Sequence, residues 1–257
     1  MPNSDAIPWK IHLLGTTGYH PNENRQTSCT FLPASGILLD AGTAIFRIRD
    51  LIQTDTLDIF LTHAHLDHVV GLTFLLDVLH ERGVGQIRIH GEADKLEAVQ
   101  THLFSELLFP VRLENAIFLP LQAGQSIDCR GVDVEPFALP NHPGGSVGYR
   151  LTKDERSLAY VTDTTASADA SYLEKICGAD VLVHECNFAD GFEELADRTG
   201  HSTLTPVAEL ARQAEVGRLI LTHFNSLADS PAPLDLSTAK TIFSEIALGQ
   251  DGMVLTL

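Results

Sequence analysis

The sequence predicts an α/β protein in which two β-sheets pack face to face and helices cover their outer faces. Short apolar runs typical of strands come in two batches along the 257 residues, and helical patterns accompany each batch. No linker separates the batches, and 44% hydrophobic residues are ordinary for a globular protein, so we expect one domain over residues 1–257. No apolar run approaches the roughly 20 residues that a membrane-spanning helix needs.

The expected strands are apolar segments bounded by turn-forming residues. Hairpins are expected around 33–35 and around 153–156, where turn residues separate two apolar runs. In chain order, the expected strands are 10–14, 28–32, 36–39, 57–61, 87–91, 116–119, 125–129, 132–139, 147–152, 157–162, 180–183, 218–221 and 253–257.

The expected helices lie between these strands. Residues 93–108 form an amphipathic pattern that Pro110 ends, and Pro206 occupies a tolerated first-turn position. Arg47 and Arg49 are expected to be solvated. In chain order, the expected helices are 43–52, 69–79, 93–108, 169–176, 205–215 and 237–247.

The stretch that follows the apolar run 57–61 contains four candidate metal ligands within six residues, namely His63, His65, Asp67 and His68. Imidazole and carboxylate groups suit zinc, and also manganese or iron. In a tight loop the first two side chains can point one way while the last two point another, which fits two adjacent metals better than one. The alternative is a polar loop at a strand end, which would require these four residues to cluster without a metal.

Three further candidates, His142, Asp163 and His223, each come directly after an apolar strand. Taken singly, they could be a turn residue, a strand cap and a core histidine. Loops at strand ends can converge on one edge of a sheet, so we expect these three side chains to join the first four. Together they would complete two coordination spheres. His20, in a glycine-bounded loop, is a candidate for the rim of the pocket.

With this set of residues the sequence resembles the metallo-β-lactamase superfamily over nearly its whole length. The resemblance implies an αββα four-layer sandwich, the metallo-β-lactamase fold, with a two-metal site on one edge. It implies that the first metal is held by His63, His65 and His142. It implies that the second metal is held by Asp67, His68 and His223, with Asp163 and a water or hydroxide bridging the two metals.

Within that superfamily the sequence is most similar to ribonuclease Z, the tRNA 3′-end endonuclease. Leu14-Gly15-Thr16 opens the chain much as in that family, and three later segments resemble its motifs: His184-Glu185-Cys186-Asn187-Phe188, Gly200-His201-Ser202-Thr203 and Leu221-Thr222-His223-Phe224. The resemblance implies that His201 protonates the leaving oxygen, that Glu185 positions it, and that Asp67 orients the attacking hydroxide. A His–carboxylate pair suits this task, because the carboxylate supports the charged ring. The structural alternative is that His201 only caps the helix that begins near Thr205.

The sequence also departs from ribonuclease Z. That family carries a tRNA-gripping arm between the positions of His142 and Asp163, which here are only 21 residues apart (163 − 142), enough for one hairpin. The early Arg-Asn pair is Arg25-Gln26, and the usual Ser-x-Arg-Tyr stretch is replaced by 225–228. A net charge of −17, from 34 acidic and 17 basic residues, repels a polyanion at long range.

We therefore expect a dinuclear metal-dependent phosphodiesterase that resembles ribonuclease Z and hydrolyses a phosphodiester with a metal-bridging hydroxide. Two divalent metal ions are the expected cofactors, with Zn²⁺ first and Mn²⁺ or Fe as alternatives. One alternative is a phosphodiesterase for small cyclic or diester phosphates with no tRNA processing. The missing arm favours this alternative, whereas His201 and Glu185 favour the ribonuclease Z-like activity. Another alternative is a non-catalytic, metal-stabilised binding protein.

The expected partner is a phosphodiester substrate, either a small molecule or RNA, with no membrane association. The four cysteines are far apart and form no CxxC pair, and the N-terminus lacks the pattern of a signal peptide, so a cytoplasmic location is expected. The resemblance leaves a homodimer open, because many relatives dimerise so that one subunit's loops complete the neighbour's site.

Overall fold

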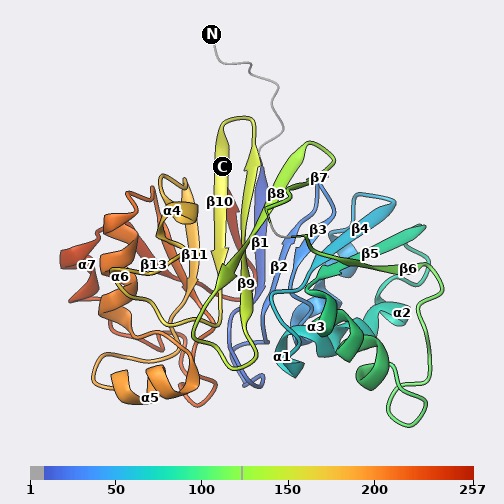
Figure 1. Ribbon diagram of the computed structural model, residues 1–257, viewed down its shortest axis with the longest axis horizontal. Coiled ribbons are helices and arrows are strands. Elements are labelled where there is room, and N and C mark those ends of the chain that lie inside the picture. Colours follow the sequence, from blue (N-terminus) through green and yellow to red (C-terminus); the bar gives the residue numbers. More distant parts are fainter. Residues whose placement is uncertain (1–8, 123) are drawn as a thin grey trace.

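The computed structural model describes residues 9–122 and 124–257, and its strands form two seven-stranded sheets (Figure 1). The first sheet has the order β14-β1-β2-β3-β4-β5-β6, with strands Met253–Thr256, Lys10–Gly15, Cys29–Leu32, Ile37–Leu39, Thr56–Phe60, Gln86–Gly91 and Ala116–Pro120. The second has the order β13-β12-β11-β10-β9-β8-β7, with strands Ile246–Leu248, Leu219–Thr222, Val181–Glu185, Arg156–Val161, Ser146–Lys153, Val132–Leu139 and Ile127–Cys129.

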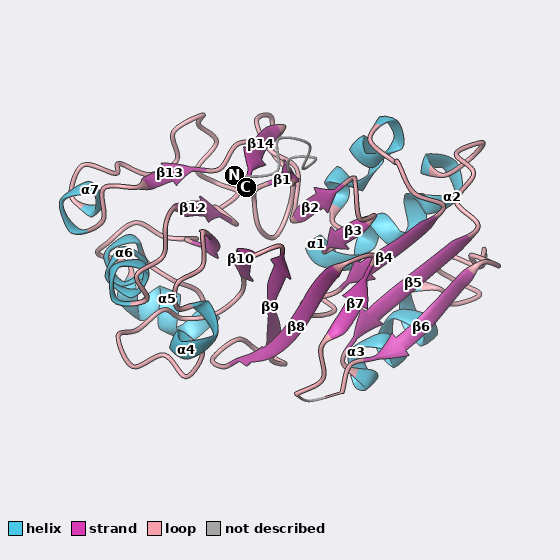
Figure 2. Ribbon diagram, turned by 90° about the horizontal axis from the view of Figure 1, so that it is seen from above, coloured by secondary structure: helices cyan, strands magenta, loops and turns pink. Residues whose placement is uncertain are grey.

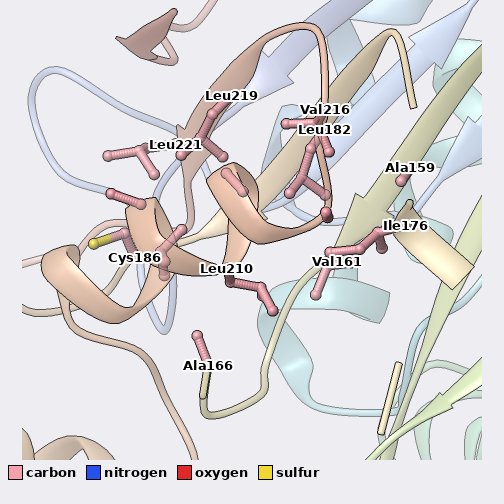
Figure 3. Packing of buried hydrophobic residues seen from close by; sticks show 14 of the residues in the cluster. Ala159, Val161, Ala166, Ile176, Leu182, Cys186, Leu210, Val216, Leu219 and Leu221 are labelled. Carbon is pink, nitrogen blue, oxygen red and sulfur yellow. The ribbon is translucent and has the colours of Figure 1, made fainter. Parts of the chain in front are cut away.

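Three apolar clusters hold four layers together. Figure 2 shows these layers from above, with the helices outside the two sheets. The middle cluster fills the space between the sheets and includes Phe60 from one sheet and Tyr149 from the other. A second cluster joins the first sheet to its helices. The third joins the other sheet to helix α6 (Leu204–Gln213) through residues such as Leu210 and Leu219 (Figure 3). The predicted αββα four-layer sandwich, the metallo-β-lactamase fold, is therefore confirmed.

The helices are short. They are η1 (Thr43–Asp50, 3₁₀), α1 (Leu66–Val69), η2 (Val70–Phe74, 3₁₀), α2 (Leu75–Val78), α3 (Ala93–Ala98), η3 (Val99–Leu103, π), α4 (Leu173–Ile176), α5 (Glu193–Thr199), α6 (Leu204–Gln213) and α7 (Ala239–Ile242). No helix within residues 9–122 and 124–257 is long and apolar enough to cross a membrane.

Several helix predictions were wrong in extent. Residues 69–79 do not form one α-helix. The backbone N–H of Gly71 donates to the Ala41 carbonyl (2.8 Å), and the segment runs as the 3₁₀ helix η2 between α1 and α2. The helix predicted for 93–108 ends at Leu103, and the one predicted for 169–176 covers only its second half. In the predicted helix 237–247, only Ala239–Ile242 is helical, and strand β13, which pairs with β12, begins at Ile246. Helix α5 was not predicted.

The two arginines of η1 are not free in solvent, contrary to expectation. Arg47 forms an ion pair with Asp251 (2.6 Å) and also donates to the Leu14 carbonyl. Arg49 donates to three backbone carbonyls at the C-terminal end of α2 and just after it, at 2.9 to 3.0 Å. Both side chains therefore fasten η1 to neighbouring elements.

A buried ion cluster joins the two sheets at Asp58 of β4, whose side chain is 0% exposed. Its carboxylate contacts Arg88 (2.6 Å), Arg130 (2.7 Å) and His90 (3.0 Å), and Arg130 comes from the β7–β8 turn of the other sheet. Burial alone would raise the pKa of Asp58, but the hydrogen bonds from His90, Arg88 and Arg130 outweigh it and lower the pKa to about 2.

We expect Asp58→Asn to reduce the free energy of unfolding at pH 7 by about 2 kcal/mol. Because the folded-state pKa is depressed, this stabilisation is full above the unfolded-state pKa near 4 and is lost as the pH falls through about 2. Urea denaturation of both proteins between pH 7 and pH 2.5 measures the difference, which should shrink on acidification. Asp133→Asn, at an exposed position of β8, is the control. A difference that stays constant down to pH 2.5 would contradict the assignment.

Candidate metal centre

The candidate ligands come from loops that follow strands of both sheets. These loops meet at one edge of the sandwich, between α1 and α5 at the bottom of Figure 1. Three non-glycine residues at these strand ends have positive φ angles: Asp40 (58°), Asp163 (56°) and His223 (53°). Such backbone conformations are costly for residues with a Cβ atom and concentrate at functional sites. Three of the strand ends that meet at this edge therefore share an uncommon backbone conformation.

All seven predicted ligands lie together. The donor atoms of His63, His65 and His142 lie within 4.8 Å of one another, and those of Asp67, His68 and His223 form a second such group. The two groups are those that the resemblance implied for two separate metals. The arrangement is consistent with that expectation, and the role of each residue as a ligand stays a prediction.

Asp163 lies between the two groups and offers one carboxylate oxygen to each. Its Oδ1 is 3.6 Å from His142 Nε2 and 3.9 Å from His63 Nε2. Its Oδ2 is 3.2 Å from His68 Nε2 and 3.4 Å from His223 Nε2. A carboxylate placed in this way can contact two cations at once.

The donors fit divalent metal ions. Ring nitrogens face each other at 3.2 Å between His65 and His142 and at 3.3 Å between His68 and His223. The buried Nε2 of His63 has no hydrogen-bond partner among the described residues. Burial lowers the pKa of His63 and of His142, which keeps these rings neutral. Converging neutral imidazoles and carboxylates match the ligand preferences of zinc.

Asp40, to which the sequence assigned no role, orients ligands of both groups. It is fully buried, and its Oδ2 accepts a hydrogen bond from His68 Nδ1 (2.8 Å). Its Oδ1 accepts from the Thr62 hydroxyl (3.0 Å), which in turn must accept from His63 Nδ1 (3.1 Å). His63, whose pKa is lowered by burial, therefore keeps an unprotonated Nε2 toward the centre. Burial also lowers the pKa of His68, but the carboxylates of Asp67, Asp40 and Asp163 outweigh it and raise that pKa, so metal binding at His68 Nε2 would release a proton. Like Asp163, Asp40 follows an apolar strand, and this signal could have identified it.

We expect Asp40→Asn to weaken metal binding about 10- to 100-fold, because partners that orient ligating histidines typically contribute that much. Competition with a chromophoric chelator measures the affinity. Asp50→Asn, at an exposed position of η1, is the matched control. Unchanged affinity in Asp40→Asn would mean that the two histidines hold their orientation without this carboxylate.

His201 and Glu185 form a second pair beside the ligands. His201 Nδ1 lies 3.0 Å from Glu185 Oε1, and the carboxylate is held by the backbone N–H groups of Thr164 (2.8 Å) and Ser202 (3.2 Å). Burial lowers the pKa of His201, but Glu185 and the nearby Asp163 outweigh it and raise the pKa to about 9. Thr203 rather than His201 takes the N-cap position of α6, which disfavours the alternative in which His201 is only a cap.

The loop after β1 also approaches the candidate ligands, through Gly18, Tyr19 and His20. A Cβ atom on Gly18 would lie 2.3 Å from the ring of His223, so only glycine lets this loop lie against that ring. The backbone N–H of Tyr19 donates to Asp67 Oδ2 (2.8 Å). The exposed His20 lines the pocket above the centre, as expected. Among the other histidines, His184 is fully buried against Tyr172 and has no access to the centre.

Comparison with known proteins agrees with this fold. Residues 36–224 match the model of the beta-lactamase superfamily domain. Ribonuclease Z from Archaeoglobus fulgidus is 26% identical, over 96% of this chain and 97% of its own. Ribonuclease Z from Shouchella clausii is 30% identical, over 84% of this chain and 87% of its own. The structure of the metallo-β-lactamase fold protein YhfI from Bacillus subtilis superposes with a TM-score of 0.79 and 21% identity, covering 98% of this chain and 100% of that one.

The chain therefore belongs to the beta-lactamase superfamily. Within it, the chain is a metal-dependent hydrolase similar to ribonuclease Z. The hairpin β9–β10 occupies the whole interval between His142 and Asp163, so the arm expected of ribonuclease Z is absent from that interval.

Proposed function

We propose that this hydrolase is a phosphodiesterase whose centre holds two divalent metal ions, with zinc as the expected metal. His63, His65 and His142 would hold one ion, Asp67, His68 and His223 would hold the other, and Asp163 would contact both. Bound divalent ions supply a water nucleophile at neutral pH, by lowering its pKa from 15.7 toward about 7, and offset charge on a phosphoryl group. The observation that carries the proposal is the position of Asp163, with one oxygen toward each donor group.

The protein's own residues orient and exchange protons around that nucleophile. The Asp67 carboxylate is fixed by the Tyr19 N–H at 2.8 Å, which leaves it placed to accept a hydrogen bond from an attacking water. His201 lies on the same pocket wall as His223 and Asp163 and carries a proton supported by Glu185. It is therefore placed to donate that proton to a leaving oxygen, as a general acid does.

Hydrolysis of bis(p-nitrophenyl) phosphate by the metal-replete protein tests the proposal. We expect turnover that chelation removes and that returns when zinc is added. Asp67→Ala should lower the rate at least about 10²-fold, because general acid–base groups typically contribute about 10²- to 10⁴-fold. Metal analysis of both proteins runs alongside. Absence of hydrolysis by protein that contains two equivalents of metal would contradict a phosphodiesterase and direct attention to carboxylic, thio- and sulfate esters.

A further inference from the structure

The pocket over the centre, about 300 Å³ in volume, has a wall made of two loops that are tied together. His20 Nδ1 donates to the Pro21 carbonyl (2.9 Å), so its Nε2 must accept from the Ser226 hydroxyl (3.1 Å). Asn22 Nδ2 donates to the Ser226 carbonyl (2.9 Å). The loop after β1 and the loop after β12 therefore form one continuous wall.

This wall presents apolar side chains to solvent at the pocket mouth. Tyr19 is 83% exposed and Leu227 is 84% exposed, and both line the pocket. The half-buried Phe188 lines it as well. Large apolar groups left in water beside a reactive centre are typical of ligand sites. The hydrogen bonds between the two loops involve Asn22 and the residues next to Tyr19 and Leu227 in sequence, and so hold the backbone of both loops at the pocket mouth.

The surroundings of the pocket are acidic. Of the described residues that line it, none is lysine or arginine. The two segments that form the tied wall, 19–24 and 225–229, contain no lysine or arginine, and they carry two exposed acidic residues, Glu23 and Asp229. Such a rim repels a chain of phosphates and gives it no cation to bind.

We infer that the substrate is a small phosphodiester with a single negative charge and an uncharged aromatic group on one ester arm, such as an aryl or nucleoside group, that packs on Tyr19 and Leu227. This inference rests on the proposed phosphodiesterase function and specifies its substrate class. In this arrangement the phosphate lies at the candidate metal ligands and the aromatic arm lies on the apolar wall. The acidic rim excludes longer polyanions. Tyr19 and Leu227 are then specificity-determining residues rather than catalytic ones.

Calorimetric binding of three probes to the metal-replete protein tests the inference: diphenyl phosphate, dimethyl phosphate and a single-stranded oligoribonucleotide of ten residues. Diphenyl phosphate and dimethyl phosphate carry the same charge and differ only in their arms. We expect diphenyl phosphate to bind at least about tenfold more tightly, the effect of burying part of one aromatic ring. We expect the oligoribonucleotide to bind more weakly than diphenyl phosphate at low salt, where attraction of a polyanion would be strongest.

Variants assign the effect to the wall. Tyr19→Ala and Leu227→Ala should each remove most of the preference for diphenyl phosphate, measured as the ratio of the two diester affinities, whereas Tyr19→Phe should retain it. Leu227→Ala, which contacts none of the candidate ligands, should also leave dimethyl phosphate binding unchanged. Leu107→Ala, at a leucine that is 99% exposed and lies outside the pocket, is the control. Equal binding of the two diesters, or tighter binding of the oligoribonucleotide, would overturn the substrate class and leave the phosphodiesterase standing. If none of the three probes binds, the proposed function fails together with the inference.

Discussion

Replacing Asp163 by alanine is expected to reduce bound zinc from two equivalents to at most one and to lower phosphodiester hydrolysis at least about 10³-fold, as loss of several kcal/mol of charge stabilisation would do. Its two oxygens lie 3.6 Å from His142 Nε2 and 3.2 Å from His68 Nε2, so one side chain serves both donor groups. No other carboxylate among the described residues approaches both groups in this way. Elemental analysis of dialysed protein and initial rates with bis(p-nitrophenyl) phosphate measure the two effects.

Asp163→Asn is the companion variant, because it keeps the volume of the side chain and one carbonyl oxygen but removes the charge. We expect it to bind more zinc than the alanine variant and to remain impaired in hydrolysis. Asp128→Ala, at an exposed position of β7, is the control for both. Circular dichroism verifies that the fold is retained. Two full equivalents of zinc in Asp163→Ala would show that the two metals do not share this residue.

Much of the fold was predictable because its strands are apolar runs separated by turn residues. The hairpin β9–β10 was located from its turn, where Asp154 and Glu155 adopt the positive φ angles (47° and 64°) that a tight two-residue connection needs. Helix extents were less predictable, because tertiary contacts decide where these short helices change or end. The segment after His68 changes from α-helix to 3₁₀ helix where the Gly71 N–H donates to the Ala41 carbonyl, and no local pattern encodes that contact.

The site was predictable in its residues and not in its supports. The seven candidate ligands are histidines and aspartates in segments that follow apolar strands, and the strand order brings those segments to one edge. Asp40 also follows an apolar strand, but its role appears only through its hydrogen bonds to His68 and Thr62. The apolar wall of Tyr19 and Leu227 depends on two loops about 200 residues apart in sequence, and no spacing rule could join them. The cytoplasmic location and the homodimer stay predictions.

Replacing His201 by alanine is expected to slow hydrolysis by an amount that depends on the leaving group. A diester that releases an alkoxide should be cleaved about 10²- to 10⁴-fold more slowly, because a strongly basic oxygen departs only when it is protonated. A diester that releases p-nitrophenolate should lose less than about tenfold, because that anion departs without a proton. Rates with methyl p-nitrophenyl phosphate and with a nucleoside alkyl phosphodiester, measured under single-turnover conditions, give the two values.

The contrast between leaving groups separates a proton donor from a structural residue. If His201 only supported the loop, its loss would slow both substrates alike, and zinc content would fall as well. Glu185→Gln should produce the same contrast at smaller size, since the ring keeps a hydrogen-bond partner at 3.0 Å but loses the charge that supports its proton. His80→Ala, at a side chain that is 71% exposed, should leave both rates unchanged. His201, held by the buried Glu185 carboxylate beside the candidate metal ligands, would then be the proton donor. That role would explain why the pair is present although the interval between His142 and Asp163 holds no tRNA-binding arm.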